Sequence, residues 1–256
     1  MKTFLAFLKK ELLEVVRTGK LIIILAVFVL LSASSPALTW VTPIIMDLAA
    51  DELAAAGMAG IEIQVDALTS WAMYFENIAM AMIVFAFVFG SSFTKEYSKN
   101  TLILVLTKGF ERYKIVIAKA VMMLSLWTVS YWIAFAVTYV GNDFLWDNSV
   151  AVGLWPAVLG WWVYGLFIVA LIVLFSSVMK GYIGVLLGTG GVVFALTIID
   201  IIPKASKFTP MGLLNYGELL IGAKEMSDII PALIITLVVT VAAIGASIPL
   251  MNRREI

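Results

Sequence analysis

A cluster of basic side chains between two apolar runs holds the residues of this sequence that are best suited to chemistry. Residues 94–119 carry six Lys and Arg against only two Glu. Within them, residues 100–106 (NTLILVL) form a mostly apolar piece that is too short to cross a bilayer and too apolar to be left bare in water. The chemistry that this pattern predicts is binding, and we expect another protein subunit to cover the apolar piece.

The composition of the chain predicts a membrane protein. Of 256 residues, 62% are hydrophobic and 13% are charged, and the mean hydropathy is +1.06; soluble domains have about 25% charged residues. In lipid only helices or a closed barrel satisfy the backbone, and long unbroken apolar runs such as 78–90 and 233–250 favour helices. We therefore expect an all-α, multi-pass protein of the cell (inner) membrane.

The residue types that are missing exclude several classes of enzyme. The chain has no His and no Cys, so zinc-dependent and Ser-His intramembrane proteases are excluded on chemistry. An aspartyl protease would need two carboxylates facing each other at depth, but the acids lie near the ends of the apolar runs. The sequence also has no phosphate-binding G-x-x-x-x-G-K-[ST] motif. We expect a non-catalytic chain with no cofactor or metal of its own and no nucleic-acid partner.

Six apolar runs predict a six-helix transmembrane domain over residues 21–250. The spans are expected at about 21–40, 71–93, 115–140, 153–179, 182–202 and 229–250. The fourth begins with Trp155, Trp161 and Trp162, which predict an aromatic belt at the outer interface.

Charge asymmetry predicts which segments lie inside. The segments expected inside hold 14 of the 17 Lys and Arg, and 12 of the 17 acids are outside or at outer span ends. This distribution predicts a cytoplasmic loop at 94–114, a cytoplasmic tail at 251–256 and extracytoplasmic segments at 41–70 and 203–228. Both termini are then cytoplasmic.

Residues 1–20 predict an amphipathic helix lying in the inner interface. Leucines and valines fall on one side of the helical wheel and Lys9, Lys10 and Arg17 on the other, although Glu11 and Leu13 break the pattern. The alternative is a long amino-terminal region of a signal peptide, but acids and leucines at helical spacing are atypical there.

The basic loop resembles the one between the second and third spans of ABC-2 type permeases, the membrane subunits of a class of ATP-binding-cassette transporters. The positions that fit the family pattern are Glu96, Thr101, Leu102, Leu106, Arg112 and Lys119. Two positions depart from it, since Asn100 stands where Gly is usual and Gly109-Phe110 where Pro is frequent. The six spans, the interfacial helix and the step Thr209-Pro210 extend the resemblance over essentially the whole chain.

The resemblance implies a permease subunit that forms a substrate pathway as a homo- or heterodimer, and it favours export. A coupling helix in the loop would dock on a separate nucleotide-binding subunit, which binds ATP and Mg. The expected contact residues are Glu96, Lys99, Thr101, Leu102, Val105, Leu106, Lys108 and Arg112. The alternative is that this ridge lies in the headgroup layer, with its lysines on anionic membrane lipids.

The second and fifth spans carry candidate pathway residues, because the resemblance places these spans along the pathway. Glu76, Asn77 and Asp200 are candidates for contact with substrate at an outer gate, and the alternative is that the carboxylates reach the headgroups. Gly184 and Gly188 form a G-x-x-x-G face that packs helices either between two subunits or within one.

A stand-alone channel or secondary transporter is the competing function, because the sequence alone does not show an ATPase partner. The chain has no internal repeat and no inverted pair of interrupted spans of the kind that many secondary transporters have. A membrane scaffold is a poorer fit, since a scaffold needs no glycine-rich span.

Overall fold

The computed structural model describes residues 2–49, 65–92, 94 and 111–253. Its longer helices are α1 (Lys2–Arg17), α2 (Lys20–Leu48), α4 (Ala67–Phe89), α7 (Arg112–Leu145), α8 (Leu154–Val178), α9 (Tyr182–Asp200) and α12 (Met226–Asn252). The short elements are η1 (Asn148–Val150), α10 (Pro203–Ser206), η2 (Pro210–Leu214) and α11 (Tyr216–Leu220). Six described helices are long and apolar enough to span a membrane, and the described ranges contain no strand. The prediction of an all-α, six-helix protein is confirmed.

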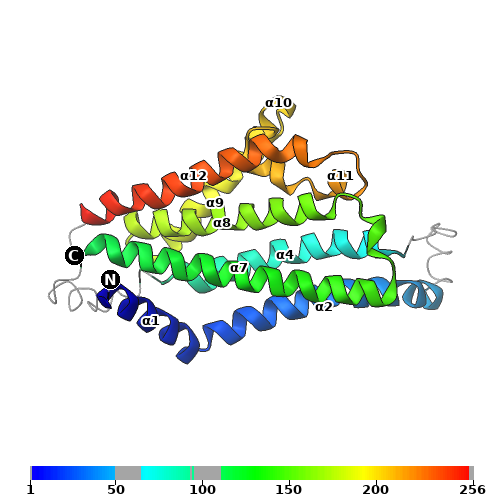
Figure 1. Ribbon diagram of the computed structural model, residues 1–256, viewed down its shortest axis with the longest axis horizontal. Coiled ribbons are helices and arrows are strands. Elements are labelled where there is room, and N and C mark those ends of the chain that lie inside the picture. Colours follow the sequence, from blue (N-terminus) through cyan, green and yellow to red (C-terminus); the bar gives the residue numbers. More distant parts are fainter. Residues whose placement is uncertain (1, 50–64, 93, 95–110, 254–256) are drawn as a thin grey trace.

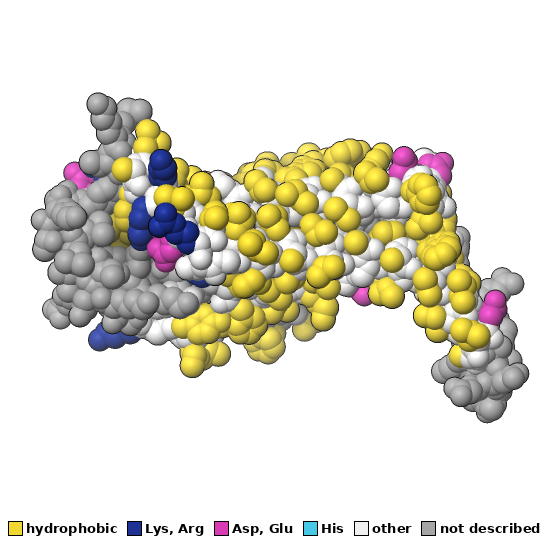
Figure 2. Space-filling model, turned by 90° about the horizontal axis from the view of Figure 1, so that it is seen from below, with side chains coloured by type: hydrophobic (Ala, Val, Ile, Leu, Met, Phe, Trp, Pro, Cys, Tyr) yellow, Lys and Arg dark blue, Asp and Glu magenta, His cyan; other side chains and the backbone are white. Residues whose placement is uncertain are grey.

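The spanning helices form an elongated bundle in which α1, the start of α7 and the end of α12 lie at one end (Figure 1). Lys and Arg side chains gather at that end of the surface in Figure 2, with a few Asp and Glu side chains among them; the charged side chains seen at the opposite end are Asp and Glu, and a broad apolar band lies between. This separation is the one on which the predicted orientation depends. The cytoplasmic side of the basic end stays a prediction.

Helix α8 lies in the middle of the bundle. In its most apolar stretch 72% of the residues are buried, against 11% in α9, and a helix that is apolar all round belongs in a core. It packs against α7, α9, α12 and η2. Glycines permit the close approaches, since a Cβ on Gly165 would lie 1.9 Å from Trp127 of α7 and one on Gly160 would lie 2.8 Å from the carbonyl oxygen of Leu213.

Two of the three tryptophans predicted as an outer belt are drawn inward. Trp155 is 56% exposed, as a belt residue would be, but Trp161 is buried. Its ring lies beside those of Phe75 on α4 and Tyr216 on α11, and Trp162 donates from Nε1 to Thr128 of α7. The belt prediction is therefore wrong for Trp161, because α11 folds back over this end of α8 and covers it.

Helices α2 and α7 extend beyond the spans predicted at 21–40 and 115–140. Helix α2 continues through Pro36, whose missing N–H leaves the carbonyl of Ser32 without its helical donor. The hydroxyl of Thr138 on α7 donates to that carbonyl at 2.9 Å. A Cβ on Gly141 would lie 2.8 Å from Pro36, so α7 fits closely against the proline.

We predict that Gly165→Ala lowers the stability of the bundle. The added methyl group would collide with the indole of Trp127, which is held by a 3.1 Å hydrogen bond from its Nε1 to the carbonyl of Trp162. Overpacking of this kind costs about 1–3 kcal/mol. The matched control is Gly191→Ala, where nothing lies within 4 Å. Thermal unfolding in detergent checks the pair, and equal melting temperatures would contradict the close contact.

Candidate functional site

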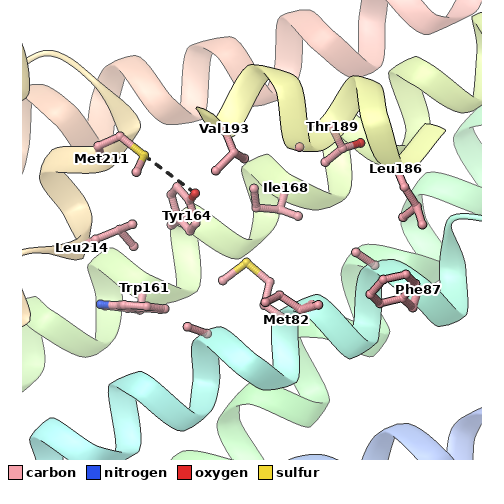
Figure 3. A pocket seen from close by; sticks show the side chains of 14 residues that line it. Met82, Phe87, Trp161, Tyr164, Ile168, Leu186, Thr189, Val193, Met211 and Leu214 are labelled. Carbon is pink, nitrogen blue, oxygen red and sulfur yellow. Dashed lines mark hydrogen bonds between the residues drawn. The ribbon is translucent and has the colours of Figure 1, made fainter. Parts of the chain in front are cut away.

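An apolar pocket of about 420 Å³ lies between α4, α8, α9 and η2 (Figure 3). Its lining residues are Ala79, Met82, Ile83, Ala86, Phe87, Trp161, Tyr164, Ile168, Leu186, Thr189, Gly190, Val193, Met211 and Leu214. Ile83 and Phe87 are each more than half exposed, so the pocket opens between α4 and α9. An apolar cavity of this size suits a hydrocarbon-rich ligand.

Two contacts between α4 and α9 close the pocket at the basic end of the bundle. The hydroxyl of Tyr182 donates to the carbonyl of Phe87 at 3.1 Å. A Cβ on Gly90 would lie 3.2 Å from the side chain of Leu186, which shows how closely the two helices meet there. At the other end Met211 and Leu214 of η2 cover the pocket. The second and fifth spans therefore line one pocket within a single chain.

Two hydroxyl groups are placed in the apolar lining. Tyr164 donates to the sulfur of Met211 at 3.8 Å, a weak bond drawn as the dashed line in Figure 3. The hydroxyl of Thr189 is buried and has no hydrogen-bond partner among the described residues. A threonine in a helix usually bonds the carbonyl four residues back, so the unpaired hydroxyl of Thr189 is an unusual polar group in the wall of the pocket.

Glu76 lies on the pocket-facing stripe of α4, beyond the pocket on the side away from the basic end. It is exposed and precedes Ile83 by two helical turns. The hydroxyl of Tyr216 is within hydrogen-bonding reach of its carboxylate. Burial and then the negative charge of Glu76 raise the pKa of Tyr216, so at neutral pH its phenol is protonated and can serve as a donor.

Asp200 occupies the corresponding place on α9, two helical turns beyond the pocket residue Val193. Its Oδ1 is buried and has no hydrogen-bond partner among the described residues. A buried acceptor without a donor is costly and needs an explanation. Glu76 and Asp200 thus lie on the two stripes that flank the pocket, although contact with substrate stays a prediction for both.

Asn77 faces a different helix from the pocket. Its Nδ2 donates to the carbonyl of Leu31 at 2.9 Å and to the hydroxyls of Ser35 and Ser34 at 3.0 and 3.3 Å, all on α2. These bonds give Asn77 a role in joining α4 to α2. Its expected role at a gate rests on the resemblance alone.

The glycines of α9 divide into a packed set and an open set. A Cβ on Gly188 would lie 2.5 Å from the ring of Phe175 on α8, and one on Gly184 would lie 3.2 Å from Met179. This favours packing of the G-x-x-x-G face within one chain. Gly190 and Gly191 have nothing within 4 Å, and Gly190 lines the pocket.

Most of the predicted coupling residues lie outside the described residues: Glu96, Lys99, Thr101, Leu102, Val105, Leu106 and Lys108. Arg112 is described, at the start of α7. Its guanidinium donates to the carbonyls of Met251 and Asn252 at 3.2 and 3.1 Å. A positive charge at the last carbonyls of α12 is favourable, so Arg112 joins the base of the loop to the end of the sixth span.

Sequence reasoning did not find the pocket. Most of its residues are ordinary apolar members of three spanning helices, with Met211 and Leu214 added from η2, and no single window distinguishes them from lipid-facing positions. One usable signal was the run Thr189-Gly190 within an apolar helix, which leaves a hydroxyl beside open space.

A comparison with protein families agrees with this architecture. The profile of the family described as ABC-2 family transporter protein matches residues 5–243. No curated protein and no solved structure gives a significant match. The matched region runs from α1 into α12; it includes the first five spanning helices, the larger part of the sixth, both walls of the pocket and the basic loop. This chain therefore belongs to the ABC-2 family of transporter proteins, as a multi-pass membrane component.

Proposed function

We propose that this chain is the permease subunit of an ATP-driven exporter, which pairs with a second permease chain and with separate ATPase subunits that bind ATP and Mg. The family match supports the transport role. The observation that carries the proposal further is the pocket between the second and fifth spans, because a permease needs a site within the bilayer that the movement of helices can open and close.

The ATPase would act through the loop at 94–114. Its two ends are built into the bundle, since α4 leads into it and Arg112, near its carboxyl end, bonds the end of α12. A force on the loop would therefore reach the second, third and sixth spans together. Because the bond from Tyr182 to the carbonyl of Phe87 joins α9 to α4 at the basic end of the pocket, a tilt of α4 about that contact would widen or narrow the mouth of the pocket.

The substrate class that fits the pocket is an apolar or amphipathic molecule entering from the bilayer. The lining offers aromatic and aliphatic surface and the two hydroxyls of Thr189 and Tyr164. It contains no charged side chain, so a charged head group would have to stay outside. Glu76 and Asp200 lie where such a group would pass.

We predict that Leu102→Asn disrupts the docking of the ATPase subunit. Loss of an apolar anchor at the centre of an interface costs about 2 kcal/mol or more, so recovery of the ATPase on co-purification should fall by about tenfold or more. Leu102 is a cleaner probe than charge reversal at Arg112, which would also break the bonds to α12. The control is Arg112→Lys, which keeps the positive charge. Unchanged recovery with Leu102→Asn would contradict docking by this loop.

We predict that Gly190→Phe blocks the pocket and that Gly191→Phe does not. Both glycines have open space around them, but only Gly190 lines the pocket. The probe is a fatty acid carrying a photoreactive diazirine, and the measurement is its light-dependent attachment to α8 and α9, followed by mass spectrometry. Gly190→Phe should lower attachment by about tenfold, as expected when a ring fills the space of the ligand. Equal attachment in both variants would contradict a ligand site here.

We predict that Glu76→Gln and Asp200→Asn each slow the ATP-dependent export of the same fatty acid from vesicles holding the assembled transporter. Each variant removes a charge but keeps the size of the side chain. A reduction of about threefold or more corresponds to loss of one polar contact. Full export in both variants would show that these carboxylates only reach the headgroups.

A further inference from the structure

Glu11 is placed where an interfacial helix should have an apolar residue. Phe7, Glu11 and Val15 follow one another at four-residue spacing along α1, and all three are buried. A helix that only lay on lipid would turn its carboxylates to the polar side. Burial of an unpaired carboxylate is costly, so the position of Glu11 needs a specific partner.

That partner is Lys119 on α7. Its Nζ lies 2.8 Å from Oε2 of Glu11, and the two side chains are 1% and 3% exposed. The other carboxylate oxygen of Glu11 accepts from Lys10 at 2.9 Å, and Nζ of Lys119 also donates to the carbonyl of Ser92 at 3.3 Å. The pair is therefore fully buried and bonded on both sides.

A third acid, Glu14, lies close to the pair and is surrounded by lysines. Burial acts to raise the pKa of Glu14 on the next turn, but the ammonium groups of Lys10, Lys119 and Lys20 lower it overall. Lys10 bridges both acids, with Glu14 at 3.1 Å. Lys10, Glu11 and Glu14 of α1 thus form a small charge network with Lys119 of α7.

The network joins α1 to both ends of the basic loop. Ser92 follows the end of α4, just before the loop, and Lys119 lies two helical turns after Arg112, just beyond it. Replacing a buried ion pair by apolar residues is often neutral or stabilising, so stability alone is a weak reason for this one. The pair does fix the position of α1 relative to the two segments that flank the basic loop, the end of α4 with Ser92 and the start of α7. We call these two segments the stems of the loop.

We propose that Glu11 and Lys119 are positioning residues that fasten α1 to both stems of the loop, so that α1 moves with the stems when the ATPase subunit closes. The inference rests on the proposed coupling role of the loop. Helix α1 then lies at the membrane surface and also moves together with α4 and α7 during the transport cycle.

The fastening is tested first on the chain by itself. Because the protein has no cysteine, a single cysteine can replace Val15, which is 3% exposed. We expect Lys119→Met to raise its rate of maleimide labelling by about tenfold or more, as α1 opens locally. The charge swap Glu11→Lys with Lys119→Glu should restore slow labelling in part, because it re-forms the ion pair but loses the bonds to Lys10 and to the carbonyl of Ser92. The control cysteine at Leu13, which is already exposed, should label equally in all backgrounds. Equal labelling at position 15 in all three backgrounds would overturn the fastening.

The movement is tested in the complex with the ATPase subunit. Spin labels at Leu13 on α1 and, separately, at Tyr113 on the stem are each paired with a label at Val152 at the other end of the bundle; all three positions are exposed. With ATP and vanadate both distances should change, and in Lys119→Met only the Tyr113 distance should change. The charge swap should recover the change at Leu13.

Two results would overturn the proposal, and they are distinguishable. In the first result, the Tyr113 distance changes with nucleotide, but the Leu13 distance either stays constant in the natural chain or changes by the same amount in Lys119→Met. The pair then does not move α1, and the coupling role of the loop survives. If the Tyr113 distance does not respond to nucleotide at all, the coupling role fails and the proposal for α1 fails with it.

Discussion

The whole structure depends on the absence of water in the hydrocarbon layer, where each polar group must find its partner within the protein. The bundle meets this need with side-chain donors placed at particular carbonyls. Thr138 donates to the carbonyl that Pro36 leaves open on α2, and Tyr131 on α7 donates to the carbonyl of Val158 on α8 at 2.7 Å. These bonds fix the rotation of α7 between its two neighbours. In this arrangement the indole of Trp127 on α7 lies directly against Gly165 of α8.

Against this background, unsatisfied groups indicate function more clearly than satisfied ones. Helix α9 is the least buried span, yet it carries a buried hydroxyl at Thr189 and a buried carboxylate oxygen at Asp200 without donors or acceptors among the described residues. Both lie on the stripe that faces the pocket. The same reasoning explains Glu11, whose charge is placed on an apolar face and is met there by Lys119. The pocket-facing stripe of α9 and the ion pair of α1 with α7 are thus two places in the described bundle where polar groups do more than satisfy the backbone.

Sequence reasoning predicted the six spans, because long apolar runs and alternating charge are one-dimensional signals. It did not predict which helix would be central, since α8 and α12 have similar hydropathy and differ in burial. Trp161 was expected at the interface because its position at the start of a span is visible in the sequence. The packing of α11 against it is a tertiary contact, which the sequence pattern does not show. The pocket was missed for the same reason. Glu11 was noticed only as a break in an amphipathic pattern, and its partner is 108 residues away.

The central claim is that the basic loop is held by an ATPase subunit. The most direct measurement is photo-cross-linking from benzoylphenylalanine placed at position 104, within the apolar piece of the loop, in membranes that contain both proteins. A covalent adduct with the ATPase subunit, lost when that subunit is omitted, is the predicted result. Adducts with lipid alone, or reaction with a reagent confined to the outer side of the membrane, would contradict it.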